Sequence, residues 1–204
     1  MYLHEFMKAT GIQKPLLAYR GNIFETPADH IAFAVHWPNK EGYSNNDNGG
    51  FSSKVAEFGW PELGSIIFQK GISVSKKIKG KWFHALPVHT PEDGGWDESP
   101  MLIEDCLNKL PVGSDEVIAI VLIGGGDAGE KYKASIKNLE GMIRTYKTVV
   151  LYVYDDIMFN LLIGTGVVAQ GTPHNTPLSE LPRVYKYREM VNRDLKRIGE
   201  PVLE

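Results

Sequence analysis

The strongest constraint on the fold is one apolar segment and the glycine-rich turn that follows it. Residues Glu116–Ile123 are all apolar after the first, and the chain then runs through Gly124-Gly-Gly-Asp-Ala-Gly129 into a helical pattern from about Glu130 to Tyr146. A short continuous apolar run bounded by glycines is typical of a strand that is covered on both faces. The segment therefore predicts a buried strand that leads through a turn into a helix.

The same alternation of strand and helix patterns recurs along the chain. Further strands are expected at Leu16–Arg20, Ile31–His36 and Thr148–Tyr154, a hairpin at Ile72–Lys77 and Lys81–Val88, and helices at Phe51–Phe58, Pro61–Gln69 and Glu98–Leu110. Strands that alternate with helices indicate a mainly parallel sheet with helices on both of its faces. The expected fold class is α/β, with a mixed sheet in a three-layer α/β/α arrangement.

Length and pattern predict one domain with an extension. The 204 residues suffice for a sizeable core. Residues 1–156 carry the strand and helix alternation and form the expected domain. Residues 157–204 are expected to be an extension packed on that domain, with a loop over Gly164–Pro177 and a charged helix over Leu178–Ile198.

Charge and composition narrow the classes of partner. With 22 lysines and arginines against 25 acidic residues, the net charge of -3 argues against a nucleic-acid surface, which needs a basic excess. The basic stretch Lys70–Lys81 is interpreted as a hairpin with solvated lysines. No membrane partner is expected, because no apolar run approaches the length of a membrane span and the first residues lack a signal-peptide pattern. A cytoplasmic location follows as the expectation.

The one cysteine, Cys106, lies in a helical pattern and is interpreted as a core thiol, so no intramolecular disulfide is expected. His84 alternates toward the core side of the hairpin and is interpreted as structural. A metal site that uses His89, Asp93 and a third ligand fits no standard spacing. Neither a metal nor another cofactor is therefore expected.

Glycines follow the predicted strands at the places where a ligand would bind. These segments are Gly21-Asn22, the polar loop Lys40–Gly50, and Gly124–Gly129. Glycines between a strand and a helix let backbone N–H groups approach an anion, and the helix N-terminus adds a favourable dipole. Two such loops, the polar loop Lys40–Gly50 and Gly124–Gly129, indicate a diphosphate held between them. The alternative is that each glycine-rich turn is there for steric reasons alone.

Two stretches in this arrangement resemble the macro domain family. Leu17-Ala-Tyr-Arg-Gly-Asn-Ile-Phe-Glu-Thr-Pro-Ala-Asp-His-Ile-Ala-Phe-Ala-Val-His36 resembles its opening, and Val117-Ile-Ala-Ile-Val-Leu-Ile-Gly-Gly-Gly-Asp127 resembles its second ligand loop. The hairpin strand Lys81–Val88 and the strand ending at Tyr154 fall in the family's order. The resemblance covers roughly residues 15 to 155. Within the family it is closest to the branch of the terminal ADP-ribose glycohydrolase and its phage relatives, and it implies ADP-ribose or a related nucleotide as ligand.

The resemblance implies a set of ligand-binding residues. Asn22 stands where the family has an aspartate that binds the adenine amino group, and Ile23 follows it in the same motif. Tyr154 stands where an aromatic ring stacks on adenine, although a strand-end core residue is the alternative. The two phosphate and ribose loops are matched by Gly49, Gly50 and Phe51, and by Gly124, Gly125, Gly126, Asp127, Ala128 and Gly129.

The departures from the family pattern bear on catalysis. His36 occupies the place of the asparagine that many members hold near the distal ribose, and His89 the place of a lysine in the glycohydrolase branch. Asp127 matches that branch's loop aspartate. These three side chains are the candidate catalytic residues, because histidine and aspartate can exchange protons near neutral pH.

Two functions therefore stay open. The first is hydrolysis of an ADP-ribose derivative, either an ADP-ribosylated macromolecule or ADP-ribose 1″-phosphate. The second is binding without turnover, in which the chain reads or sequesters an ADP-ribose-type nucleotide. A dinucleotide-binding enzyme of another doubly wound fold is disfavoured, because no Gly-x-Gly-x-x-Gly follows the first strand.

Overall fold

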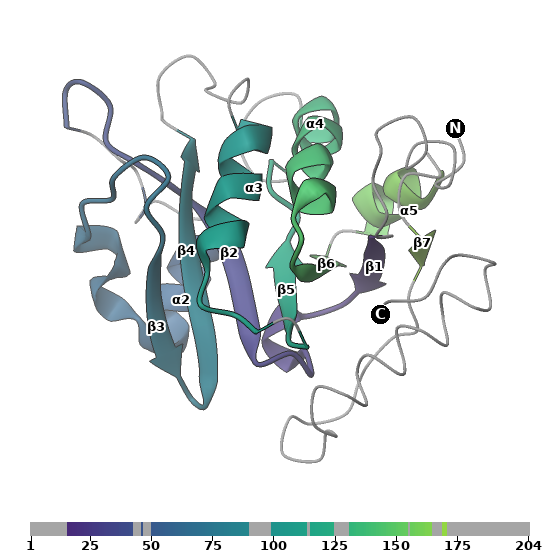
Figure 1. Cartoon of the computed structure of the whole chain (residues 1–204), viewed down its shortest axis with the longest axis horizontal. Coiled ribbons are helices and arrows are strands. Elements are labelled where there is room, and N and C mark those ends of the chain that lie inside the picture. The colour runs from purple at the N-terminus through teal and green to yellow at the C-terminus, as the bar shows by residue number, and fades with distance from the viewer. Residues whose placement is uncertain are drawn as a thin grey trace.

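The computed structural model describes residues 16–42, 46, 50–89, 99–113, 115–124, 131–154, 156–164 and 169–170. Strands and helices alternate as the sequence predicts (Figure 1). In chain order the elements are β1 (Leu17–Arg20), η1 (Ile23–Glu25, a 3-10 helix), β2 (His30–His36), α2 (Gly50–Gly59), η2 (Pro61–Ser65, also 3-10), β3 (Val74–Ile78), β4 (Lys81–His89), α3 (Ser99–Lys109), β5 (Val117–Val121), α4 (Lys131–Arg144), β6 (Thr148–Val153), α5 (Asp156–Gly164) and β7 (Ala169–Gln170).

The strands form one mixed sheet in the order β3-β4-β2-β5-β6-β1-β7. In the described part of the chain, β3 is antiparallel to its neighbour and all other pairs are parallel, which confirms the predicted mainly parallel sheet. The prediction of an uninterrupted loop over Gly164–Pro177 is wrong at Ala169 and Gln170. These two residues pair with Leu17 and Ala18, because the outer backbone groups of β1 need hydrogen-bond partners.

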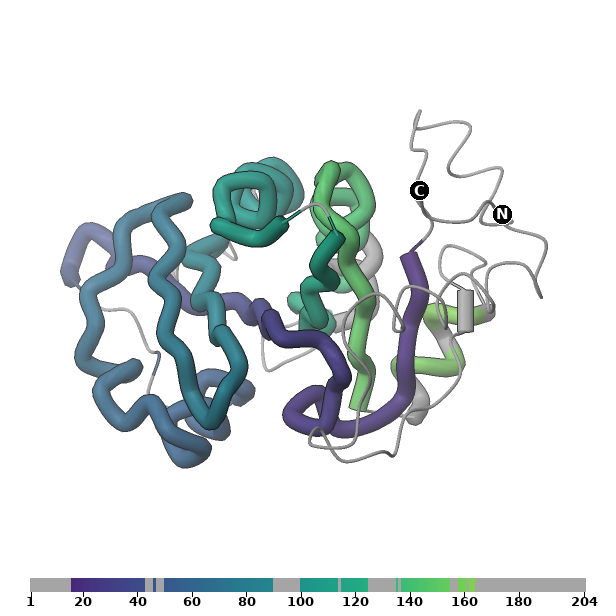
Figure 2. Tube along the Cα trace, turned by 60° about the horizontal axis from the view of Figure 1, so that its bottom comes forward, coloured from purple at the N-terminus to yellow at the C-terminus, as the bar shows by residue number. Residues whose placement is uncertain are grey.

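Helices cover both faces of the sheet, so the fold is the predicted three-layer α/β/α arrangement. Successive strand residues point to opposite faces, as in β2, where Ala32 belongs to one core and Ile31 and Phe33 to the other. Helices α3, α4 and α5 pack on the first face, and η1, α2 and Leu63 of η2 on the second. Figure 2 shows α3 and α4 side by side on their face of the sheet.

Helix α5 belongs to the same core as α3 and α4. Its Phe159 and Leu162 are buried together with Leu139 and Met142 of α4. The charged helix expected over 178–198 lies outside the described residues. Across the described ranges, no helix combines the length and the apolar character that a membrane crossing requires.

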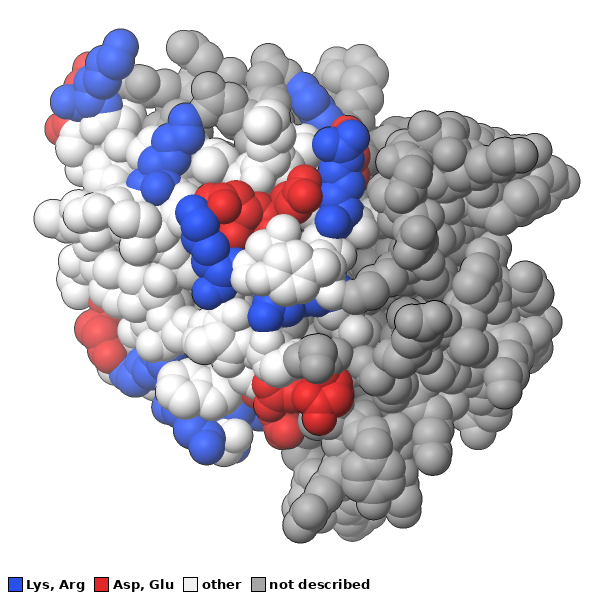
Figure 3. Space-filling model, in the orientation of Figure 1, with Lys and Arg blue, Asp and Glu red and all other residues white. Residues whose placement is uncertain are grey.

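The outer surface of α3 and α4 carries charges of both signs, as Figure 3 shows. Lys109 Nζ lies 2.5 Å from Asp105 Oδ2, and an Arg144 nitrogen lies 3.0 Å from Glu140 Oε1. Both pairs are four residues apart on a helix, where opposite charges stabilise it by a few tenths of a kcal/mol. On the inner side Cys106 is buried, and burial raises the pKa of its thiol, as expected for a core cysteine.

One helix is shorter than predicted. The helix expected over Pro61–Gln69 is a 3-10 helix that ends at Ser65, and Ile66 has extended backbone dihedrals. A central glycine and two consecutive β-branched isoleucines disfavour continued helix. The chain can then leave the helix and reach the start of β3.

The predicted hairpin is confirmed, but one of its lysines is buried instead of solvated. Lys79 and Gly80 both have positive φ, +48° and +89°, as a two-residue type I′ turn requires. The prediction of solvated lysines over Lys70–Lys81 is wrong for Lys81, which is 4% exposed. Its Nζ donates to the backbone carbonyls of Thr26 and Ala28, which are buried and need a donor. Burial lowers the pKa of Lys81 to about 8.

We expect Lys81→Met to destabilise the fold by roughly 1–3 kcal/mol. The substitution keeps the apolar stem but leaves two buried carbonyl groups without their donor. Lys77→Met on the same hairpin is the control, because Lys77 is exposed and its replacement should cost about 0.5 kcal/mol or less. Urea unfolding of both variants measures the difference, and equal midpoints would show that the buried ammonium is not needed.

Candidate functional site

The predicted site residues gather along one edge of the sheet. Strands β1, β2, β4, β5 and β6 are parallel, so their carboxyl ends lie on a common edge. Open α/β sheets bind their ligands at this edge. The described site residues found there, in strand order, are His89 at the end of β4, His36 at the end of β2, Gly124 after β5, Tyr154 after β6 and Asn22 after β1.

The edge is long enough for an extended ligand. From β4 to β1 there are four steps between neighbouring strands, and each step is about 4.8 Å, so the edge spans about 19 Å. A nucleoside diphosphate sugar has a comparable length when it is extended. The two candidate histidines lie at one end of this edge, and Asn22 and Tyr154 lie toward the other.

A shift of register brings His36 and His89 together. Val35 is opposite Pro87, but His36 is opposite His89, so Val88 is an extra residue on β4. Bulges of this kind re-aim side chains at the ends of strands. The Nε2 atoms of the two rings are 2.8 Å apart, and the ring planes meet at 74°.

Both histidines are neutral near pH 7. Burial lowers the pKa of His36 to about 4. Burial, and secondarily the neighbouring His36, lowers the pKa of His89 to about 3. A hydrogen bond between two neutral imidazoles needs one donor and one acceptor, so the two rings hold different tautomers. In the described part of the chain, Nδ1 of His36 is buried and has no hydrogen-bond partner.

Asn46 holds the end of β2 in place. Its Oδ1 accepts a hydrogen bond from the backbone N–H of His36 and its Nδ2 donates to the carbonyl of the same residue, both at 2.8 Å. The side chain is 2% exposed. Sequence reasoning interpreted its surroundings only as a polar loop and missed this contact. No local signal distinguishes Asn46 from the other asparagines of the loop.

The turn after β1 uses Asn22 as a cap. Its Oδ1 accepts a hydrogen bond from the backbone N–H of Phe24 at 3.1 Å and so begins η1. Asn22 is exposed, and an amide oxygen has a second lone pair, so the side chain can still accept a bond from a ligand. Ile23 is buried in the core and cannot contact a ligand through its side chain.

At the glycine-rich end of the first loop, Gly50 and Phe51 are described. Gly49 lies outside the described residues, whereas Gly50 begins α2 with a φ of +68°, a backbone conformation that favours glycine. Phe51 stacks on Phe24 with ring centroids 5.3 Å apart and meets the edge of Phe33 at 5.5 Å. Its ring therefore packs against the core and fixes the start of α2 against η1, while the residue stays partly exposed.

Among the described residues of this edge, Tyr154 is the most exposed aromatic residue. It is 80% exposed, which contradicts the alternative interpretation as a core residue. The Nζ of Lys54, from α2, lies 5.6 Å from the centre of its ring. The pair offers a flat ring beside a positive charge. Sequence reasoning missed Lys54, because only the fold brings α2 next to the end of β6.

The second glycine loop is described at its first residue. Gly124 is buried and has a φ of +90°, so the chain turns sharply after β5. Gly125, Gly126, Asp127, Ala128 and Gly129 lie outside the described residues. Asp93, considered as a metal ligand, also lies outside them. Within the described ranges, no three potential ligands gather in a way that could hold a metal ion.

Comparison with known proteins gives structural similarity but no sequence family. No family model matches the sequence, and no curated protein does. Among solved structures, a chain described as alphavirus P23pro-zbd has a TM-score of 0.51 and 17% identity, over 74% of this chain and 23% of that one. The macrodomain of Thermus aquaticus DarG has a TM-score of 0.49 and 15% identity, over 69% of this chain and 97% of that one.

The X-domain of IBV has a TM-score of 0.47 and 13% identity, over 74% of this chain and 99% of that one. This chain thus corresponds to under a quarter of the length of the alphavirus chain, which carries the highest of these three scores. At 17% identity the similarity to that chain concerns the fold alone. The chain therefore shares its three-layer α/β/α fold with a solved structure, and the similarity goes no further than the fold.

Proposed function

We propose that the chain binds ADP-ribose or a related nucleotide along the carboxyl edge of its sheet. The observation that carries the proposal is the exposed ring of Tyr154 with the ammonium group of Lys54 beside it. A base stacks on an exposed aromatic ring, and a nearby lysine attracts phosphate. Asn22 lies at the end of the neighbouring strand β1, where its amide can accept a hydrogen bond from an adenine amino group.

The sequence resemblance to macro domains supports the same ligand. It implies adenine near Asn22 and Tyr154 and the distal ribose near His36, with His89 in the position of the glycohydrolase branch's lysine. These two groups of residues lie at opposite ends of the edge, in the order that an extended ADP-ribose requires. The hairpin and loop sequences favour the branch of the terminal ADP-ribose glycohydrolase within that family.

We expect Tyr154→Ala to weaken ADP-ribose binding roughly tenfold or more, since stacking of a base on an aromatic ring contributes about 1–3 kcal/mol. Tyr146→Ala is the matched control, because Tyr146 is also exposed and has Lys147 Nζ 5.2 Å from its ring centre, but precedes β6 at the opposite edge. Calorimetric titration of the wild type and both variants measures the effect. Equal affinities in the three proteins, or no binding by the wild type, contradicts the proposal.

Hydrolysis is the second candidate, and the contact between His36 and His89 favours it. A neutral imidazole can take a proton from an attacking water, and its partner can share the resulting charge through the Nε2–Nε2 contact. We propose Asp127 as a further group of this reaction, from the sequence resemblance. The substrates are ADP-ribose 1″-phosphate and ADP-ribosylated macromolecules.

Chromatography of ADP-ribose 1″-phosphate after incubation separates the two candidates. Release of phosphate by the wild type, and its loss in His36→Gln and Asp127→Asn with binding retained, is expected of a hydrolase. Unchanged substrate together with tight binding is expected of a protein that only binds.

A further inference from the structure

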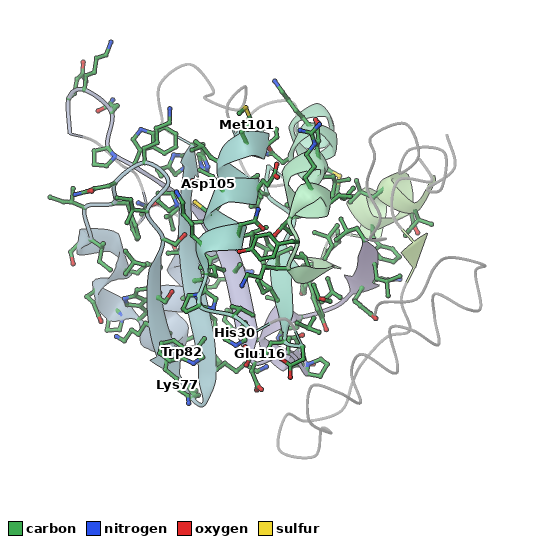
Figure 4. The ribbon with its side chains drawn as sticks, in the orientation of Figure 1. His30, Lys77, Trp82, Met101, Asp105 and Glu116 are labelled. Atoms are coloured by element: carbon green, nitrogen blue, oxygen red, sulfur yellow. The ribbon has the colours of Figure 1, made fainter. Side chains whose placement is uncertain are left out.

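A second group of polar side chains lies at the opposite edge of the sheet, away from the carboxyl ends. It contains Glu116 just before β5, His30 at the start of β2, His84 in β4 and Ser75 in β3. Figure 4 shows His30 and Glu116 close together, with Trp82 and Lys77 nearby on the hairpin. The side chains of His30 and His84 are buried, while Ser75 is exposed.

The four side chains form a continuous chain of contacts. Ser75 Oγ is 2.7 Å from His84 Nδ1, and His84 Nε2 is 3.0 Å from His30 Nδ1. His30 Nε2 is 3.4 Å from Glu116 Oε1. The other carboxylate oxygen of Glu116 accepts a hydrogen bond from the backbone N–H of Gly113, which fixes the direction of the carboxylate.

The contacts define where each proton lies. A carboxylate beside Nε2 of His30 favours the proton on that nitrogen, so Nδ1 of His30 accepts from Nε2–H of His84. Nδ1 of His84 is then an acceptor, and the hydroxyl of Ser75 donates to it. A serine hydroxyl that donates to an imidazole, which is in turn oriented by further groups, is the arrangement of an activated nucleophile.

The hairpin geometry explains why Ser75 is both close to His84 and open to a substrate. The turn closes on the pair Ile78 and Lys81, and hydrogen-bonded and non-hydrogen-bonded pairs alternate from there. Ser75 and His84 are consequently a non-hydrogen-bonded pair, whose side chains approach most closely. The backbone N–H of Ser75 points away from β4, toward the side of β3 on which no described strand pairs.

We infer that Ser75 is the nucleophile of a second site, which takes an acyl group from an ester. Ser75 Oγ attacks the carbonyl carbon while its proton moves to Nδ1 of His84. The outward backbone N–H of Ser75 donates to the oxyanion. The bond between the carbonyl carbon and the leaving oxygen then breaks, and His84 returns the proton to that oxygen. Water removes the acyl group by the same steps.

Neighbouring side chains indicate the kind of acyl group. Trp82 lies on the same side of β4 as His84, since the two are two residues apart on a strand. It is 39% exposed, and Nζ of Lys77 lies 5.9 Å from the centre of its ring. An exposed indole beside the nucleophile suits an apolar or aromatic acyl group.

The proton on His84 is shared through His30 toward Glu116, so Glu116 acts as a positioning residue.

The test is covalent labelling of the full chain with a fluorophosphonate, followed by intact mass and peptide mapping. Fluorophosphonates react with activated serines, and fluoride leaves with the serine proton. We expect one label per chain, on Ser75, and none on Ser75→Ala. Ser65→Ala is the control and labels like the wild type, because the exposed Ser65 donates only to the backbone carbonyl of Glu62. An unlabelled wild type, or a label on another serine, overturns the inference.

The carboxylate has its own test. We expect Glu116→Gln to slow labelling at least tenfold with an unchanged unfolding midpoint, and Glu116→Asp to restore most of the rate. Hydrolysis of p-nitrophenyl acetate, followed as release of p-nitrophenolate, should fall in the same order. Equal rates for all three proteins would show that the chain of contacts is structural, and a loss of rate that follows a loss of stability would show the same.

Discussion

Lowering the pH from 7 to 5 is expected to reduce the free energy of unfolding by several kcal/mol. Three histidines are the cause. Burial lowers the pKa of His36 to about 4, and the pKa of His84 and of His89 to about 3. In the unfolded chain the pKa of each is about 6.5. As the pH falls below this value, these histidines become protonated in the unfolded chain but stay neutral in the folded protein.

The direction and the size of the effect follow from this difference. Wherever the unfolded state binds more protons than the folded state, stability falls as the pH falls, by about 1.4 kcal/mol per pH unit for each histidine. The fall begins near pH 6.5 and continues to about pH 4 for His36 and about pH 3 for the other two. Because His36 is partly exposed, its share is smaller. The total remains large against the roughly 5–15 kcal/mol that stabilises a typical domain.

Urea unfolding at pH 7, 6 and 5 measures the slope. The fluorescence of Trp60 is a suitable signal, because this side chain is 2% exposed in the fold. The double variant His36→Gln, His89→Gln removes two of the three groups, so its free energy of unfolding should vary with pH only about one third as steeply. A wild type that is equally stable at pH 7 and pH 5 would falsify the prediction. So would a double variant that keeps the wild-type slope.

Most of the fold could be predicted from the sequence because its signals are local. The apolar runs of β5 and β6, and the turn at Lys79 and Gly80, each depend on a few adjacent residues. Lys81 shows the limit of that approach. Its neighbours in the sequence are exposed lysines, and only the packing of the Thr26–Ala28 segment against the start of β4 reveals why this lysine is buried.

The candidate site was predictable as a place but not as a geometry. The rule that ligands bind at the carboxyl edge located His36, His89 and Tyr154. Their contact partners come from elsewhere in the chain. The bulge at Val88 sets the approach of the two histidines, and Lys54 reaches Tyr154 from a helix about a hundred residues earlier in the chain. Register and helix docking are non-local, so no window of sequence contains them.

Replacing Gly141 by alanine is expected to destabilise the fold by about 2–3 kcal/mol, although alanine has the higher helix propensity. Gly141 lies inside α4, where alanine is intrinsically favoured by about 1 kcal/mol. A Cβ at this position would lie 2.2 Å from the carbonyl oxygen of Pro100 and 2.9 Å from Cβ of Ile103. The first contact is with the backbone of α3, so a side-chain rotation cannot relieve it.

The clash outweighs the propensity because α3 cannot move away freely. Ile103 and Leu107 fix α3 to the sheet in the same core that holds α4. Overpacking of such an interface costs roughly 1–3 kcal/mol, and more where backbone atoms meet. The expected fall in Tm is about 5–10 °C, at roughly 2–4 °C per kcal/mol for a domain of this size.

Lys137→Ala is the matched control for this substitution. Lys137 lies one turn earlier on α4 and is exposed, so its replacement should change Tm by no more than about 2 °C. Thermal unfolding followed by circular dichroism compares the two variants with the wild type. If Gly141→Ala is as stable as the wild type or more stable, helix propensity decides at this position and the two helices do not pack as closely as the structure indicates. If it melts lower, the glycine is there because α3 and α4 need the space, and the conformational cost of a glycine inside a helix is offset by their contact.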